Sequence, residues 1–151
     1  MWFRNKIANP FVRLLLRSPL HGMLSAALLL ITYHGRKSGK EYTLPVQYVQ
    51  DDHVIYIVSG EPEQKTWWRN LRGGTPVRLL LAGRTFTGKA NILAVDAEAV
   101  QIARALGLYL QHFPAAAKMY TVRRQKDGSF NQEDLRRAVA SNVIVRVELE
   151  Q

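Results

Sequence analysis

Three apolar segments follow one another along this sequence, and the short turns between them limit the folds that the chain can adopt. The segments are Leu28–Tyr33, Tyr42–Val49 and Val54–Ser59, and each has the composition of a β-strand. The connections are too short to hold a crossover helix, so neighbouring strands must pair antiparallel. This pattern disfavours a doubly wound parallel sheet, and the sequence contains no GxGxxG motif to support one.

The rest of the chain adds further strands and helices to this antiparallel core. Thr66 and Asn131 are candidate helix N-caps, and a proline break is expected at Pro114. Six mostly antiparallel strands with inserted helices predict a single α+β domain over residues 1–151, built on a small closed or partly closed barrel with helices outside it. The remaining predicted elements are a helix over Trp67–Arg72, a hairpin of Val77–Ala82 and Thr85–Val95, helices over 96–112 and 131–141, and a strand over Val143–Leu149.

Residues 1–27 are expected to form a helical N-terminal extension. Asn9-Pro10 and Ser18-Pro19 each place a capping residue before proline, which predicts helices over 10–17 and 19–26. An apolar stripe edged by basic residues favours packing on the core, or alternatively contact with a membrane surface. The apolar stretch is shorter than the roughly 20 residues that a spanning helix requires.

The charge distribution indicates an anionic ligand. The formal net charge is +9, and seven Lys and Arg residues precede the first acidic residue, Glu41. Such a field attracts phosphates, nucleic acid or an anionic membrane. Nucleic acid is disfavoured because the aromatic residues are not interleaved with the basic ones. No cysteine is present and the four histidines are widely spaced, so we expect no metal site and a reducing, cytoplasmic location.

The segment Gly35–Lys40 is the strongest candidate for an anion site. Glycines permit a tight turn whose backbone N–H groups face an anion. Arg36 offers a planar fork, Lys37 a point charge and Ser38 a hydroxyl donor. A solvated hairpin turn is the alternative interpretation.

The second candidate segment contains two adjacent tryptophans, Trp67 and Trp68. Neighbouring side chains on a helix point about 100° apart. We therefore predict that Trp67 enters the core while Trp68 lines a cleft for a planar ring, although core packing alone explains either tryptophan taken singly.

Together these segments resemble the deazaflavin (F420)-dependent nitroreductase and quinone reductase family, whose members are relatives of the split-barrel flavin-binding proteins. The resemblance rests on GRKSG at 35–39, Pro45-Val46, the strand that ends at Ser59, and WWRNL at 67–71. It implies a split β-barrel that binds coenzyme F420 and delivers a hydride to a quinone, nitro compound or enone. FMN is the alternative cofactor. A further alternative is a split-barrel protein that binds a lipid-like ligand without redox activity.

The resemblance also assigns roles to individual residues. Arg36, Lys37 and Ser38 would hold the phosphate, and Pro45 and Val46 would lie beside the ring. Ser59 and Tyr48 are the candidate catalytic residues, with Ser59 near the reacting face. The full set of expected cofactor-binding residues is Gly35, Arg36, Lys37, Ser38, Gly39, Pro45, Val46, Ser59, Gly60, Lys65, Thr66, Trp68 and Asn70.

The expected partners follow from the same resemblance. They are a small-molecule hydride acceptor and a second copy of the chain, because split barrels pair to cover exposed sheet edges. Peripheral membrane contact through the basic N-terminal helix is a further expectation.

Overall fold

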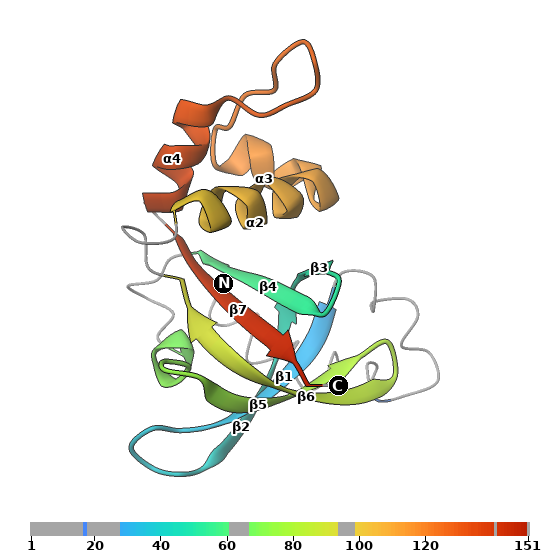
Figure 1. Ribbon diagram of the computed structural model, residues 1–151, viewed down its shortest axis with the longest axis vertical. Coiled ribbons are helices and arrows are strands. Elements are labelled where there is room, and N and C mark those ends of the chain that lie inside the picture. The colour runs from blue at the N-terminus through green and yellow to red at the C-terminus, as the bar shows by residue number, and fades with distance from the viewer. Residues whose placement is uncertain (1–16, 18–27, 61–66, 94–98, 141, 151) are drawn as a thin grey trace.

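One sheet of antiparallel strands dominates the computed structural model, which describes residues 17, 28–60, 67–93, 99–140 and 142–150 (Figure 1). The strands lie in the order β2-β1-β5-β6-β7-β4-β3. This architecture confirms the expected α+β split barrel. The strands of the described chain are β1 (Leu28–His34), β2 (Glu41–Gln47), β3 (Val49–Asp51), β4 (Val54–Gly60), β5 (Thr75–Leu81), β6 (Arg84–Ile92) and β7 (Asn142–Leu149).

The described sheet has seven strands instead of the predicted six, because the segment expected as one strand over Tyr42–Val49 divides at Tyr48. Strand β2 pairs with β1, with Gln47 opposite Leu28, whereas β3 pairs with β4, with Val49 opposite Tyr56. These two strands lie at opposite edges of the sheet, yet only Tyr48 separates them. The two edges must therefore approach each other, which curls the sheet into a barrel.

The turn between β5 and β6 lies at Ala82-Gly83, one residue earlier than the sequence predicts. Both residues have positive φ angles, 50° and 78°. A two-residue hairpin with this geometry matches the right-handed twist of the strands that it joins.

The barrel interior is filled by alternate residues of its strands. Leu71, which lies in the segment between β4 and β5, is fully buried among them and anchors that segment to the barrel. Burying a leucine of this kind contributes roughly 1.5–3 kcal/mol. The strand residues with the least exposure in this cluster are Leu29, Ile31, Ile55, Ile57, Leu79, Ala90, Val145 and Val147.

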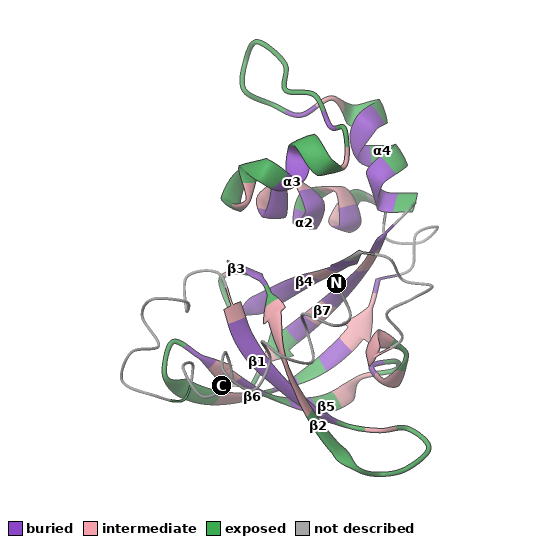
Figure 2. Cartoon of the chain, turned by 180° about the vertical axis from the view of Figure 1, so that it is seen from behind, coloured by how far each residue is buried: buried purple, intermediate pink, exposed green. Residues whose placement is uncertain are grey.

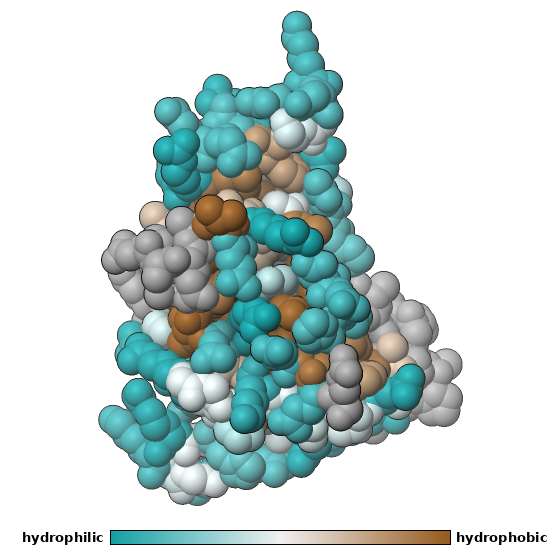
Figure 3. Space-filling view, in the orientation of Figure 1, coloured by the Kyte–Doolittle hydropathy of each residue, from teal (hydrophilic) through white to brown (hydrophobic). Residues whose placement is uncertain are grey.

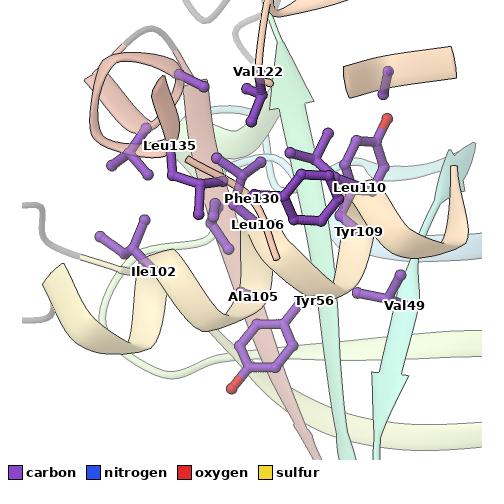
Figure 4. Close-up of a cluster of buried hydrophobic side chains, with 14 of the residues drawn as sticks. Val49, Tyr56, Ile102, Ala105, Leu106, Tyr109, Leu110, Val122, Phe130 and Leu135 are labelled. Carbon is purple, nitrogen blue, oxygen red and sulfur yellow. The ribbon is translucent and has the colours of Figure 1, made fainter. Parts of the chain in front are cut away.

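Three described helices cover one side of the barrel, at the end of the molecule opposite the β1–β2 turn (Figure 1). They are α2 (Ala99–His112), α3 (Pro114–Met119) and α4 (Gln132–Ala140). Their apolar faces meet β4 and β7 in a second cluster (Figure 4) that includes Tyr56, Leu106, Phe130 and Leu135.

The predicted ends of two of these helices are confirmed. Pro114 is the first residue of α3. At the start of α4, the Asn131 side chain accepts the N–H of Asp134 at 3.0 Å, as an N-cap does. The cap expected at Thr66, the first residues of the helix expected over 96–112, and the helices expected over 10–17 and 19–26 except for residue 17 lie outside the described residues.

No helix in the described part of the chain combines the length and the apolar character needed to cross a membrane. Hydrophilic side chains cover most of the described surface on the face shown in Figure 3.

Asp134 ties α4 to the loop that precedes it. Asp134 is 3% exposed, and its side chain accepts hydrogen bonds from the Arg123 Nε at 2.9 Å and the Arg123 backbone N–H at 3.0 Å. Arg137 lies 3.3 Å from the other carboxylate oxygen. The hydrogen bonds from Arg123 stabilise the carboxylate and lower the pKa of Asp134 to about 2.

This lowered pKa predicts a pH-dependent contribution to stability. An aspartate in the unfolded chain has a pKa of about 3.9. The contribution of Asp134 to stability is therefore complete above that pH and is lost as the pH falls towards 2. We expect Asp134→Asn to lower the free energy of unfolding at pH 7, and the difference from wild type to shrink between pH 4 and pH 2. Urea unfolding across this range measures it. A difference that stays constant down to pH 2 would contradict the assignment.

Candidate functional site

The turn between β1 and β2 projects from the barrel and is mostly exposed (Figure 2). The Gly35 N–H donates to the Lys40 carbonyl at 2.7 Å, and the Gly39 N–H donates to the Gly35 carbonyl at 2.9 Å. Gly39 has a φ of 70°, a conformation that favours glycine. At Gly35 a Cβ atom would lie 2.7 Å from the Ser38 Oγ and 2.9 Å from the Tyr42 ring. The backbone conformation therefore favours glycine at position 39, and a larger residue at position 35 would require the Ser38 hydroxyl and the Tyr42 ring to move.

A side-chain amide joins this turn to a segment 34 positions further along the chain. The Arg36 N–H donates to the Asn70 Oδ1 at 2.8 Å, and the Asn70 Nδ2 donates to the Trp67 carbonyl at 2.9 Å. Asn70 is the last residue of the 3₁₀ helix η2 (Trp67–Asn70), which is two residues shorter than the predicted helix. The next residue, Leu71, is fully buried in the barrel. The turn is therefore linked to the barrel through Asn70.

These two segments line an open cavity of about 510 Å³. The structure thus brings together the Gly35–Ser38 turn and Asn70, as the sequence predicts, and adds residues that sequence reasoning missed. The lining residues are Tyr33, Gly35, Arg36, Lys37, Ser38, Tyr42, Trp67, Arg69 and Asn70.

The cavity is positively charged and partly aromatic. Arg36, Lys37 and Arg69 line it, and none of its lining residues is acidic. The Tyr33 ring stacks on Tyr42, its partner across the hairpin, with centroids 5.7 Å apart. The centroid of the Trp67 ring lies 6.1 Å from that of the Tyr33 ring. Burial, with a smaller effect from Tyr42, raises the pKa of Tyr33, so its hydroxyl stays neutral.

The two tryptophans do not divide as the sequence predicts. Trp67 is only half-buried and lines the cavity, whereas Trp68 is half-buried and is not among the lining residues. The guanidinium groups of Arg69 and Arg72 lie 5.5 and 5.7 Å from the centre of the Trp68 ring. Trp68 therefore supports Arg69, which reaches the cavity. Trp67 is less buried than predicted: both tryptophans pack against the barrel core as half-buried side chains, because the four-residue η2 helix lies over the barrel without burying any side chain fully.

Other predicted site residues lie elsewhere on the barrel. Pro45 and Val46 are half-buried on β2, opposite Leu30 and Leu29, and do not line this cavity. Tyr48 lines a separate cavity of about 420 Å³ between β3 and the end of α2. Burial raises the pKa of Tyr48.

Ser59 is the penultimate residue of β4, and Gly60 is the last. Ser59 is 4% exposed, and its Oγ has no hydrogen-bond partner in the described part of the structure. Side chains alternate along a strand, so Ser59 lies on the same face as Ile55 and Ile57, which fill the barrel interior. Lys65 and Thr66 lie outside the described residues.

The missed residues follow from hairpin geometry. A turn over Gly35–Lys40 places His34 opposite Glu41 and hence Tyr33 opposite Tyr42, a pairing that the sequence permits us to work out. No comparable signal distinguishes Arg69 from the other exposed arginines.

A family model describes this combination of segments. The model for F420H(2)-dependent quinone reductases matches residues 17–127, which is more than half of the chain. The chain belongs to this family. Its members are oxidoreductases, and the family's description implies coenzyme F420 as the cofactor. Curated protein sequences contain no significant match.

Solved structures with low sequence identity share the fold. An F420-H2 dependent reductase (FDR-A) is 20% identical with a TM-score of 0.56, covering 81% of this chain and 94% of its own. A protein described as a domain-swapped dimer is 18% identical with a TM-score of 0.57, covering 97% of both chains. An FAD and heme binding protein from Mycobacterium smegmatis is 13% identical with a TM-score of 0.50, covering 89% of this chain and 67% of its own.

The residues of the cavity fit a cofactor of this kind. A deazaflavin nucleotide presents a phosphate and a flat ring. The cavity supplies three cations without an opposing acid, and β2 continues from it along the barrel towards Val46. The buried, unpaired hydroxyl of Ser59 is a polar group that a bound molecule can satisfy.

The positions of the two tryptophans yield a prediction. Trp67→Ala removes a wall of the cavity and the ring beside Tyr33, so it should weaken F420 binding more than Trp68→Ala does. Fluorescence titration of each purified variant with F420 measures the affinities, and thermal melts identify any loss of folded protein. Equal or reversed effects on affinity would exclude Trp67 as the cofactor-facing tryptophan.

Proposed function

We propose that this protein is an F420H2-dependent reductase that transfers a hydride from the reduced deazaflavin to a quinone, nitro or enone acceptor. The main observation in its favour is the cavity at the β1–β2 turn, which Arg36, Lys37 and Arg69 line and which has no acidic lining residue. Charge-assisted contacts of this kind are the strong ones for phosphate. The turn would hold the cofactor phosphate.

The direction of β2 supports a position for the ring. Five residue steps separate Lys40 from Pro45, and an extended strand rises about 3.3 Å per residue, so the two are roughly 17 Å apart along the strand. A ribityl chain followed by a tricyclic ring is suited to this span. Val46 packs against the barrel interior, which Tyr48 helps to fill and which Ser59 faces. The ring would therefore lie beside Pro45 and Val46, with Ser59 and Tyr48 on the reacting side.

The cofactor, when bound, supplies the hydride, and the protein's residues bind, orient and exclude water. Burial keeps the Tyr48 phenol protonated at neutral pH, so it remains a hydrogen-bond donor. The Ser59 hydroxyl is likewise an uncharged donor in an apolar interior. Either group is suited to hydrogen-bond an acceptor oxygen as negative charge develops on it.

The decisive experiment compares cofactors directly. Purified protein is titrated with F420 and, separately, with FMN, and binding is followed by absorbance and fluorescence. The proposal requires F420 to bind more tightly than FMN, and F420H2 to be oxidised when menadione is added. Preference for FMN would favour the alternative of an FMN-binding split barrel. Binding of neither would favour a split barrel that takes a lipid-like or other ligand.

Three further assignments belong to this proposal. The acceptor is a small molecule, and the protein acts in the cytoplasm or in peripheral contact with the membrane surface. A homodimer is proposed because a structure of the same fold is described as a domain-swapped dimer. The basic N-terminal segment that would make the membrane contact lies, apart from residue 17, outside the described residues.

The two cations of the turn provide a quantitative prediction. Each charge-assisted contact contributes roughly 1.5–3 kcal/mol, and 1.4 kcal/mol corresponds to about tenfold in affinity. We expect Arg36→Ala and Lys37→Ala each to weaken F420 binding about tenfold or more. Lys89→Ala and Arg136→Ala are matched controls, because both side chains are exposed and lie outside the cavity. Unchanged affinity in the Arg36→Ala, Lys37→Ala double variant would refute the phosphate site.

A further inference from the structure

Only some of the backbone N–H groups of the β1–β2 turn donate hydrogen bonds within the described structure. Those of Gly35 and Gly39 bond to carbonyls within the turn. The Lys40 N–H donates to the Ser38 Oγ at 3.2 Å. The Arg36 N–H donates to the Asn70 Oδ1 at 2.8 Å.

Two consecutive N–H groups in the same turn donate no hydrogen bond within the described part of the structure. Those of Lys37 and Ser38 have no acceptor in the described part of the structure. Both residues line the cavity and are exposed. Consecutive backbone N–H groups in a turn form a concave site suited to an anion.

The orientation of the Asn70 amide follows from the groups that it meets. The Arg36 N–H is a donor and requires the amide oxygen, whereas the Trp67 carbonyl is an acceptor and requires the amide nitrogen. The Thr75 hydroxyl donates to the Arg72 carbonyl at 2.8 Å and lies 3.3 Å from the Asn70 backbone carbonyl, and Leu71 beside Asn70 is fully buried. Asn70 is thus held by the barrel on one side and holds the turn on the other.

We propose that Asn70 is a positioning residue, which fixes the turn so that the N–H groups of Lys37 and Ser38 receive the cofactor phosphate. This inference rests on the proposed function. Asn70 acts through Arg36: by taking up the Arg36 N–H, it sets the direction of the peptide groups that follow. A turn already fixed in its binding conformation loses less conformational entropy when the ligand binds.

The first test concerns the turn without any ligand. Hydrogen exchange of the Arg36 amide, followed by NMR, should be fast in Asn70→Ala and slow in wild type. Asn70→Asp retains an oxygen for the Arg36 N–H but loses the donor to the Trp67 carbonyl, so it should protect this amide more than Asn70→Ala does and less than wild type. Asn91→Ala is the matched control, because Asn91 lies on β6 outside the cavity. Equal protection of the Arg36 amide in wild type and Asn70→Ala would overturn the proposal.

The second test separates phosphate binding from ring binding. Asn70→Ala should weaken F420 binding about tenfold, because the turn loses one hydrogen bond that holds it in its binding conformation. The affinity for the deazaflavin riboside, which lacks the phosphate, should stay unchanged. Equal weakening of both ligands would show that Asn70 does not act through the phosphate site.

A third measurement keeps this inference distinct from the proposed function. Titration of wild-type protein with inorganic phosphate should shift the NMR signals of the Lys37 and Ser38 amides, and the same titration of Asn70→Ala should shift them less. If wild type binds neither F420 nor the riboside, the proposed function fails, yet these phosphate shifts still support the anion site. If phosphate leaves both amides unchanged in wild type, the anion site itself is refuted.

Discussion

The covalent link through Tyr48 is the constraint on which the rest of the structure depends. Strands β2 and β3 pair with opposite edges of one sheet, and a single residue joins them. Two edges held one residue apart cannot lie in a flat sheet, so the sheet must curl. Curling gives the molecule an interior, and the apolar alternation of β1, β4, β5 and β7 fills it.

The candidate site depends indirectly on this curled sheet, through the segment that contains Asn70 and Leu71. Leu71 is held in the barrel interior, and it fixes the short η2 helix beside the end of the β1–β2 hairpin. Asn70 then spans the remaining gap to Arg36. The basic cavity thus has two walls from segments 34 positions apart, each supported by a different contact with the same barrel. Charge alone would not place these walls together.

The sequence predicts the strands well because their apolar alternation, glycine turns and proline breaks are local signals. It also predicts that the glycine-rich turn and Asn70 belong to one site, through the family resemblance. It does not predict the division at Tyr48, because β2 and β3 form one uninterrupted apolar pattern and the division depends on pairing with distant partners. Ideal α-helix geometry predicts separate roles for Trp67 and Trp68, whereas η2 is a four-residue 3₁₀ helix. Arg69 enters the site through its stacking on Trp68, a contact for which a single sequence contains no signal.

The packing around Gly35 separates the tolerance of the fold from the tolerance of the site. Every other amino acid would bring a Cβ into the Ser38 hydroxyl and the Tyr42 ring, and relief requires those two groups to move. Both are exposed residues near the tip of a hairpin, so the displacement is confined to the turn and leaves the barrel interior intact. A substitution at Gly35 is thus expected to leave the fold intact while it displaces two residues that line the candidate cavity. A screen that measures only the stability of the folded chain would therefore overlook such a substitution.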